Sequence, residues 1–308
     1  MSSDKLIKRR IRSSKNISQI TKAMEMVSAS KMRRAQDMAL SSRPYSEKMV
    51  QIITALALRA KDQLDHFLLK DPRLNWEESQ EFNVLIILFS TDKSLCGGLN
   101  SNLFRGLENW LKDLTATYKL PLKTKLNFIT VGRKAKEHIL KSNRFLNAEF
   151  GHFGDKPKFA DILPVSRMVI EGFEAGKFQM AFLSYMEFIS TISQKLAVKQ
   201  LLPIRAEEIT SPETPVLPMQ SLKSDYLFEP RAEEIFSTLL PQYIELQLYH
   251  VLLEAVASEH SARMVAMKNA NENALDIVDE LTLEYNRARQ SKITNELLDV
   301  VGARMALE

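Results

Sequence analysis

The sequence predicts an α/β protein in which two long terminal helices form an antiparallel two-helix coiled coil and carry an inserted, mainly parallel α/β domain. Glycine is absent from residues 1–96 and 177–301, and proline is absent from residues 1–43 and 242–308. A glycine costs about 1 kcal/mol and a proline about 3 kcal/mol in a helix interior relative to alanine. Both ends of the chain can therefore be long helices, while the glycine-bearing middle alternates strand and helix patterns.

The first long helix is expected over residues 4–60. Its apolar residues recur at spacings of three, four and three, which predicts one stripe along a helix face. The stripe consists of Ile17, Ile20, Met24 and Val27. Pro44 lies within this segment and predicts a kink or bend near residues 41–43, because proline removes one helical hydrogen bond and crowds the preceding turn.

The last long helix is expected from Pro241 to about Val301, with Pro241 in the first turn, where its missing N–H is harmless. Apolar residues again recur at helical spacing, namely Ala274, Ile277, Leu281, Ala288, Ile293, Leu297 and Val300. A helix of about 60 residues is roughly 90 Å long at about 1.5 Å per residue, so it must pair with the other long helix or enter a partner. Because Lys31, Arg34 and Lys292 fall near seam positions, we expect a loose coil that leaves one face for other chains.

The central segment has the rhythm of a Rossmann-like domain. We expect strands at 83–90, 126–131 and 179–185, and helices at 101–118, 132–142 and 159–175. Strands that alternate with helices predict a mainly parallel sheet with right-handed crossovers. The expected domains are an N-terminal coiled-coil helix at 1–60, the α/β domain at 80–203, a proline-rich linker at 204–232 and a C-terminal coiled-coil helix at 233–308.

The sequence offers no convincing catalytic, cofactor-binding or metal-binding site. Gly97 and Gly98 follow a predicted strand and could cradle a phosphate, but they match neither the dinucleotide fingerprint nor a Walker loop. The simpler interpretation is a tight turn in which Asn100 or Ser101 caps the next helix. The five histidines lack metal-ligand spacing. Glu259-His260 is better read as a solvated or interface pair than as an acid–base pair. Cys96 is the only cysteine, which excludes an internal disulfide.

The first helix is strongly basic, with ten Lys or Arg and a single acid, Glu25, between Lys5 and Arg34. Such a face could bind nucleic acid phosphates, although it lacks the aromatic residues that stack on bases. It could equally bind an acidic protein surface or simply be solvated. Acidic residues in the last helix disfavour nucleic acid; they are Asp276, Asp279, Glu280, Glu284, Glu296 and Asp299.

Longer motifs resemble the gamma subunit of rotary F-type ATP synthases almost from end to end. The first is ITKAMEMVSASKMR at residues 20–33, and the loop CGGLN at 96–100 resembles the central domain. The last helix matches through SEHSARMVAMKNA at 258–270, NRARQ at 286–290 and ITNEL at 293–297. Departures are Lys93-Ser94 for a usual Arg-Gly, Asn295 for a usual Gln, and Gly302-Ala303-Arg304 for a common Gly-Gly-Ala.

The resemblance implies a non-catalytic rotor subunit that couples proton flow through the membrane sector to ATP synthesis or hydrolysis at the beta subunits. Implied partners are three alpha and three beta subunits, the epsilon subunit and the c-ring, with no nucleic acid and no cofactor. The implied beta-subunit contacts are Lys22, Met24, Arg289, Gln290 and Thr294. Val300, Val301 and Ala303 would suit an apolar sleeve around the tip.

The start of the sequence lacks a transit peptide, which favours a bacterial protein at the cytoplasmic face of the inner plasma membrane, attached indirectly through the c-ring. The alternative is a basic coiled-coil nucleic-acid-binding or scaffold protein.

Overall fold

The computed structural model describes residues 3–60, 66–75, 81–121, 123–151, 153–154, 156–204 and 232–305. Apart from its two end residues, the predicted linker at 204–232 lies outside the described residues. The chain divides into two compact units: residues 30–262 form one, and residues 1–29 with 263–308 form the other. This division cuts through both long helices, and the boundaries expected from sequence remain predictions.

The two long helices are present. Helix α1 spans Ser3–Ala60 and helix α6 spans Ala232–Met305. Pro44 lies inside α1, which continues through it as one helix. Just before it, the Ser41 and Ser42 hydroxyls donate hydrogen bonds to carbonyls one turn back, at 2.9 and 3.0 Å.

The expected start of the last helix at Pro241 is wrong, because α6 begins at Ala232 and Pro241 lies in its interior. The apolar face explains the difference. Phe236, Leu240 and Ile244 recur at helical spacing on both sides of the proline and are at most 1% exposed. Fully burying three such side chains contributes about 1.5–3 kcal/mol each, which outweighs the cost of about 3 kcal/mol for an interior proline.

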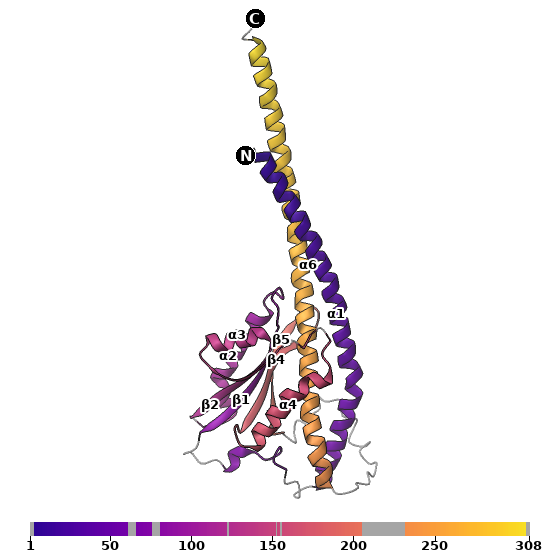
Figure 1. Ribbon diagram of the computed structural model, residues 1–308, viewed down its shortest axis with the longest axis vertical. Helices are drawn as coiled ribbons and strands as arrows, with labels where there is room; N and C mark the ends of the chain where they lie inside the picture. Colours follow the sequence, from indigo (N-terminus) through magenta and orange to yellow (C-terminus); the bar gives the residue numbers. More distant parts are fainter. Residues whose placement is uncertain are drawn as a thin grey trace. The chain divides into compact units, whose positions relative to one another are not determined.

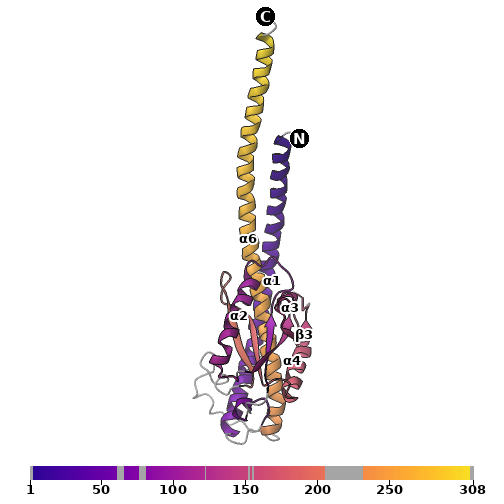
Figure 2. The same ribbon diagram turned by 90° about the vertical axis from the view of Figure 1, so that its left-hand side faces the viewer.

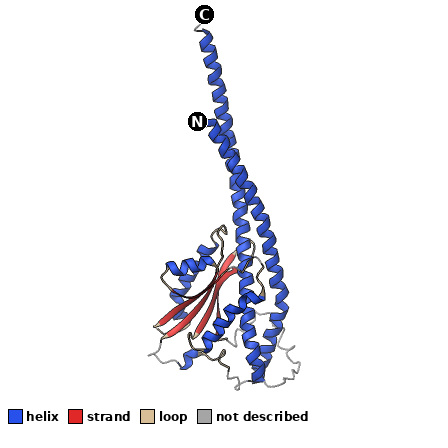
Figure 3. Ribbon diagram, in the orientation of Figure 1, coloured by secondary structure: helices blue, strands red, loops and turns tan. Residues whose placement is uncertain are grey.

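The unit of residues 30–262 contains a five-stranded sheet in the order β3-β2-β1-β4-β5 (Figure 3). Its strands are β1 (Phe82–Phe89), β2 (Thr124–Val131), β3 (Phe145–Phe150), β4 (Met180–Phe188) and β5 (Gln194–Leu202). Strands β1 to β4 are parallel to one another, and β5 pairs antiparallel with β4. A mainly parallel, Rossmann-like sheet is thereby confirmed.

Strands β3 and β5 were not predicted, because both lie at an edge of the sheet and lack a continuous apolar run. In β3 exposed residues alternate with half-buried ones, and β5 carries Lys195 and Lys199. The predicted helices are present with small shifts of their ends, as α2 (Leu99–Thr117), α3 (Arg133–Lys141) and α4 (Phe159–Glu174). A short 3-10 helix, η2 (Pro72–Asn75), precedes β1.

Two layers of helices cover the sheet (Figure 1). On one face, α2 and α3 enclose a core that includes Leu103, Leu107 and Ile139. On the other face, α4 packs together with residues 30–60 of α1 and 232–262 of α6 in a larger core. The sheet is consequently buried on both faces, as its continuous apolar strand β1 requires.

In the other unit, residues 3–29 of α1 run side by side and antiparallel with α6 from residue 263 onward, and the C-terminal part of α6 extends past the start of α1 (Figures 1 and 2). The less exposed positions of α1 follow a four–three heptad spacing, namely Ile7, Ile11, Ser14, Ser18, Thr21, Glu25 and Ser28. Those of α6 do the same, at Met267, Asn271, Ala274, Val278, Leu281, Tyr285 and Ala288. These residues form the seam of an antiparallel coiled coil.

The stripe predicted from sequence is not this seam. Ile17, Ile20 and Val27 are 49%, 59% and 52% exposed, and Met24 is half-buried. Arg34 and Lys292, expected near the seam, are exposed, whereas Lys31 is half-buried. Between residues 14 and 28 of α1, small and polar residues take the seam positions instead. None of the described helices has an apolar stretch long enough to cross a membrane.

Candidate partner-contact surface and the sheet-end network

Two of the residues implied as contacts lie on the paired part of α1. The Lys22 side chain is 54% exposed, and its ammonium group forms an ion pair with Glu25 at 3.0 Å. Met24 is half-buried beside the seam. Lys22 thus presents a charge to solvent, while Met24 offers only part of its side chain to a partner.

The other three residues, Arg289, Gln290 and Thr294, lie near the C-terminal end of α6. Every residue from 289 to 302 is exposed, and α6 runs on beyond the start of the described part of α1 (Figure 2). The Thr294 hydroxyl donates to the Gln290 carbonyl of its own helix at 2.9 Å. The structure therefore places these three on one stretch of α6 that has no neighbouring helix among the described residues. Lys22 and Met24 lie elsewhere, on the paired part of α1.

The sequence did not predict the exposed apolar residues of this stretch as contacts, with the exception of Val300, Val301 and Ala303 near the tip. Ile293, Leu297 and Leu298 are 44%, 61% and 63% exposed, and Val300 and Val301 are 68% and 54% exposed. The Ala303 side chain lies outside the described residues. Apolar side chains left open in a row on a long helix are typical of a surface that another protein covers.

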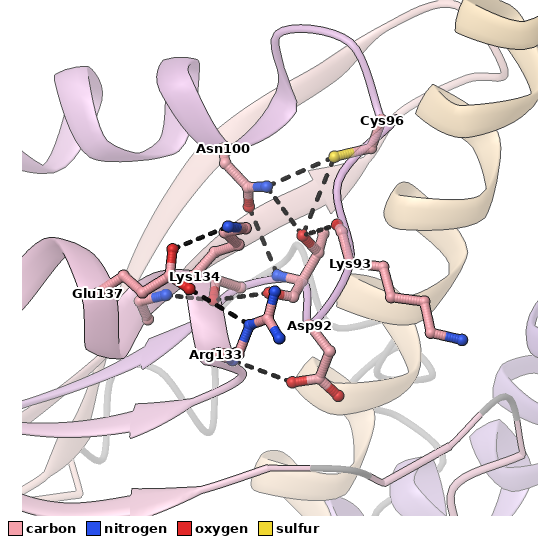
Figure 4. A network of polar contacts seen from close by, with 10 residues as sticks. Asp92, Lys93, Cys96, Asn100, Arg133, Lys134 and Glu137 are labelled. Carbon is pink, nitrogen blue, oxygen red and sulfur yellow. Dashed lines mark hydrogen bonds and ion pairs between the residues drawn. The ribbon is translucent and has the colours of Figure 1, made fainter.

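At the carboxyl end of the sheet, the loop that follows β1 is bound to the start of α3 (Figure 4). The Arg133 N–H donates to Asp92 Oδ1 at 2.9 Å, and the Lys134 N–H donates to the Thr91 carbonyl at 3.1 Å. The Ala135 N–H donates to the Ser90 hydroxyl at 2.7 Å. These are N–H groups that a helix start leaves without an internal partner.

Because the loop already satisfies those N–H groups, the start of α3 has none of these three donors left for a phosphate. Gly132 lets the two segments approach, since a Cβ there would lie 2.2 Å from the Ser90 carbonyl oxygen, and its φ of +102° favours glycine. The nearby cavity, lined in part by Ser90, Gly132 and Glu259, has a volume of about 40 Å³. Ligand pockets measure roughly 300–1,000 Å³, so this cavity suits a water molecule rather than a nucleotide.

The predicted cap by Asn100 or Ser101 is wrong. Helix α2 begins at Leu99 with Gly98 as its N-cap and has no side-chain cap. Asn100 turns back to the β1 loop, where its amide donates to the Thr91 hydroxyl at 2.8 Å and to Cys96 Sγ at 3.4 Å. The loop offers this amide more partners than the helix start does. The turn itself is confirmed, with Gly97 at a φ of +58°.

A second polar cluster lies between α6 and the β4–β5 pair. The buried His250 Nε2 lacks a hydrogen-bond partner, while the buried Tyr185 hydroxyl and the Glu254 carboxyl group interact with each other. Burial raises the pKa of Glu254, against the opposing effect of Lys199. Burial, with a smaller effect of Lys199, lowers the pKa of His250. No group of three His, Cys, Asp or Glu side chains in the described ranges could hold a metal ion. His260 is only 4% exposed, so it is not a solvated residue.

Comparison with known proteins decides the class. The family model described as ATP synthase matches residues 3–307. The ATP synthase gamma chain of Dehalococcoides mccartyi (strain CBDB1) is 41% identical over 308 residues, all of both chains. This chain belongs to the ATP synthase gamma chain family. The gamma chain of Chloroflexus aurantiacus (strain J-10-fl) is 39% identical over 307 residues, covering 100% of this chain and 99% of the relative.

Solved structures agree on the fold of this gamma-family chain. A chain of the Euglena gracilis mitochondrial ATP synthase, from a cryo-EM structure of OSCP, F1 and the c-ring, superposes with a TM-score of 0.61 at 22% identity. The alignment covers 99% of this chain and 94% of that one. A chain of the Tetrahymena thermophila central stalk and c-ring gives a TM-score of 0.53 at 21% identity, over 82% and 99% of the two chains.

As a gamma-family member, the chain is a central-stalk subunit of the ATP synthase complex, and it is non-catalytic. Family membership favours the rotor over the alternative of a nucleic-acid-binding or scaffold protein. The complex is membrane-associated and has a soluble F1 part. These conclusions rest on relatedness along the full chain; the residues that contact partners are a separate question.

Proposed function

We propose that the exposed faces of the coiled coil transmit rotation to the beta subunits through Lys22, Met24, Arg289, Gln290 and Thr294. A rotating shaft changes a neighbour's conformation only if it contacts the neighbour's alternative states differently. An uneven surface of basic, polar and apolar residues on a stiff helix provides such differential contacts. The residues would act by binding and displacing partner surfaces, without any bond chemistry of their own.

One observation carries the proposal: residues 289–302 of α6 are all exposed although they include several large apolar side chains. Most of the stability of a helix in a protein comes from the packing of its apolar face, and the apolar side chains of this stretch have no such packing within the described chain. A surrounding protein sleeve would supply that packing. Three alpha and three beta subunits in a ring are the partners that the family resemblance implies.

We further propose that the unit of residues 30–262 binds the epsilon subunit and the c-ring at the cytoplasmic face of the plasma membrane, so that membrane association is indirect. The Euglena and Tetrahymena chains come from assemblies that contain a c-ring, which supports this assignment by analogy. The apolar core on both faces of the sheet makes this unit a rigid body that can be turned as a whole.

The experiment reverses the charge at Lys22 and at Arg289, separately, in the complete ATP synthase reconstituted into vesicles. We expect Lys22→Glu and Arg289→Glu to lower the number of protons pumped per ATP hydrolysed, while ATP hydrolysis by the complex continues. Lys112→Glu, at an exposed position of α2 in the other unit, changes the net charge by the same amount and should leave the ratio unchanged. An unchanged ratio in both shaft variants would refute the assignment of these contacts.

A further inference from the structure

A hydrogen bond crosses the coiled-coil seam near its middle. The Ser18 hydroxyl donates to Asn271 Oδ1 at 2.7 Å, joining residues 253 positions apart in sequence. Ser18 is 8% exposed and Asn271 is half-buried. A single polar residue in a coiled-coil seam is the feature that most often fixes register and orientation, at some cost in stability.

Two hydroxyls in or beside the seam do not share this role. Thr21 Oγ1 donates to carbonyls of its own helix, those of Ile17 and Ser18, at 2.9 and 3.0 Å. The Thr282 hydroxyl on α6 likewise donates to the Val278 carbonyl at 2.6 Å. A hydrogen bond within one helix is unaffected by the direction in which the helix faces, because its donor and acceptor rotate together. The bond between Ser18 and Asn271 breaks if either helix turns or slides.

The sequence contains a competing seam. Each of the seam residues Ser18, Thr21, Glu25 and Ser28 is preceded by an apolar residue, and these are Ile17, Ile20, Met24 and Val27. Because successive helical residues are about 100° apart, a rotation of α1 by one residue would replace a polar seam by an apolar one. Burial of apolar surface would favour that rotated form over residues 17–28.

The N-terminal end of α1 does not share this ambiguity. Ile7 is 3% exposed and Ile11 is half-buried, and counting one heptad from the bond along each helix brings Ile11 opposite Val278. A one-residue rotation would bring Arg10 into the place of Ile11, which is unfavourable. Between residues 17 and 28, however, apolar packing favours the wrong face, so a polar interaction has to specify the right one.

We infer that the Ser18–Asn271 hydrogen bond determines the facing of α1 between residues 17 and 28, holding Ile17, Ile20 and Val27 outward and the polar residues in the seam. In the rotated form, Asn271 would face Ile17 and lose its partner while remaining partly buried, which is costly. Ser18 and Asn271 are therefore positioning residues: they fix the directions in which Lys22 and Met24 point.

The test reads the facing directly, by disulfide formation in the full-length chain. The pair Thr21→Cys with Met267→Cys reports the observed seam, and the pair Ile20→Cys with Met267→Cys reports the rotated one. In the parent background we expect the first pair to form a disulfide much faster. Mapping of the linked peptides checks that Cys96, which is 3% exposed, takes no part.

In an Asn271→Leu background, the ratio of the two rates should fall by about tenfold or reverse, because the polar preference is lost and an apolar seam is favoured. Asn273→Leu is the matched control, since Asn273 is exposed and lies off the seam. The exchange Ser18→Asn with Asn271→Ser retains a polar pair and should restore the parent ratio. A ratio unchanged by both Asn271→Leu and Ser18→Ala would overturn the inference.

A second measurement separates this inference from the proposed function. The helix facing does not depend on the proposed function, whereas the effect of that facing on coupling does. In the reconstituted complex, Asn271→Leu should lower the protons pumped per ATP and the exchanged pair should restore them, whereas a merely structural role predicts no rescue. If the facing changes but coupling does not, the inference stands and the assignment of Lys22 and Met24 as coupling contacts falls.

Discussion

In the unit of residues 30–262, the α6 side chains Leu240, Ile244 and Leu248 are completely buried, whereas Ile17, Ile20 and Val27 of α1 in the other unit are 49–59% exposed. Both sets recur at helical spacing, so periodicity alone cannot distinguish them. The first unit has a sheet to cover and buries its apolar faces within the chain. In the coiled coil each helix has only one other helix to pack against, so one face is covered and these three apolar residues remain outside. The comparison indicates that the first unit is stabilised from within, while the coiled coil depends more on its partners.

The largest expected effect is on stability, and it compares the truncation of a buried side chain in the first unit with that of an exposed one in the coiled coil. Leu248→Ala should destabilise the chain by about 2–5 kcal/mol, because it removes a buried side chain and leaves a cavity. Ile20→Ala, the matched substitution in the coiled coil, should change stability by no more than about 0.5 kcal/mol. Urea unfolding followed by far-UV circular dichroism measures both, with the fluorescence of Trp76 and Trp110 reporting the unit of residues 30–262. Similar losses in the two variants would show that the coiled coil is as well packed as the core.

A smaller effect compares two hydroxyl groups. Ser258 is fully buried on α6 and donates to the Met186 carbonyl of β4 at 2.7 Å, so Ser258→Ala should cost about 1–3 kcal/mol. The Thr282 hydroxyl bonds only within its own helix, and Thr282→Val should cost less than about 0.5 kcal/mol. Thermal unfolding of each variant beside the parent measures the difference. If Thr282→Val proves the more harmful, the coiled coil contains a polar contact as important as those in the core.

The smallest effect depends on pH. Burial raises the pKa of Glu254 in the folded chain, so folding favours its neutral form. The associated stability is present below the unfolded pKa of about 4.3 and is lost as the pH rises through the higher folded value. Glu254→Gln should therefore be more stable than the parent at pH 8, with the gain in stability shrinking as the pH falls toward 4.5.

Glu272→Gln, at an exposed position of the coiled coil, serves as the control for the dependence of stability on pH. His250 has the opposite tendency, since its pKa is lowered and its contribution is lost as the pH falls below about 6.5. The difference in stability between the Glu254 variant and the parent, taken at each pH, separates the contribution of Glu254 from that of His250, which both proteins share. A Glu254→Gln gain that grows toward acid would contradict the burial of that carboxyl group.

The fold was largely predictable because its strongest signals are local. The long stretches without glycine allowed α1 and α6 to be recognised, and the continuous apolar run Val84–Phe89 marked a strand buried on both faces. Strands β3 and β5 were missed because edge strands bury only one side or part of their length. Pro241 was misplaced because the tertiary core, rather than local propensity, determines where α6 begins.

The five proposed contact residues were implied by the family resemblance. The structure shows how exposed they are but does not show which partner they contact. Arg289, Gln290 and Thr294 share a stretch of exposed helix, as a contact surface requires. The capping of α3 by the β1 loop could not be anticipated, since it joins Asp92 to Arg133, which follow neighbouring strands of the sheet but lie 41 positions apart in sequence. A sequence signal exists only in the polar run Ser90-Thr91-Asp92 directly after a strand.

By itself, the sequence determined which segments are helical, that a mainly parallel α/β domain interrupts them, and which family the chain resembles, because propensity, periodicity and long motifs are local properties. Only the tertiary structure decided which face of α1 meets α6. Hydropathy favours the face of Ile17 and Ile20, and the structure chooses the face of Ser18 and Thr21. That choice depends on a hydrogen bond between residues at opposite ends of the chain, which no local pattern contains.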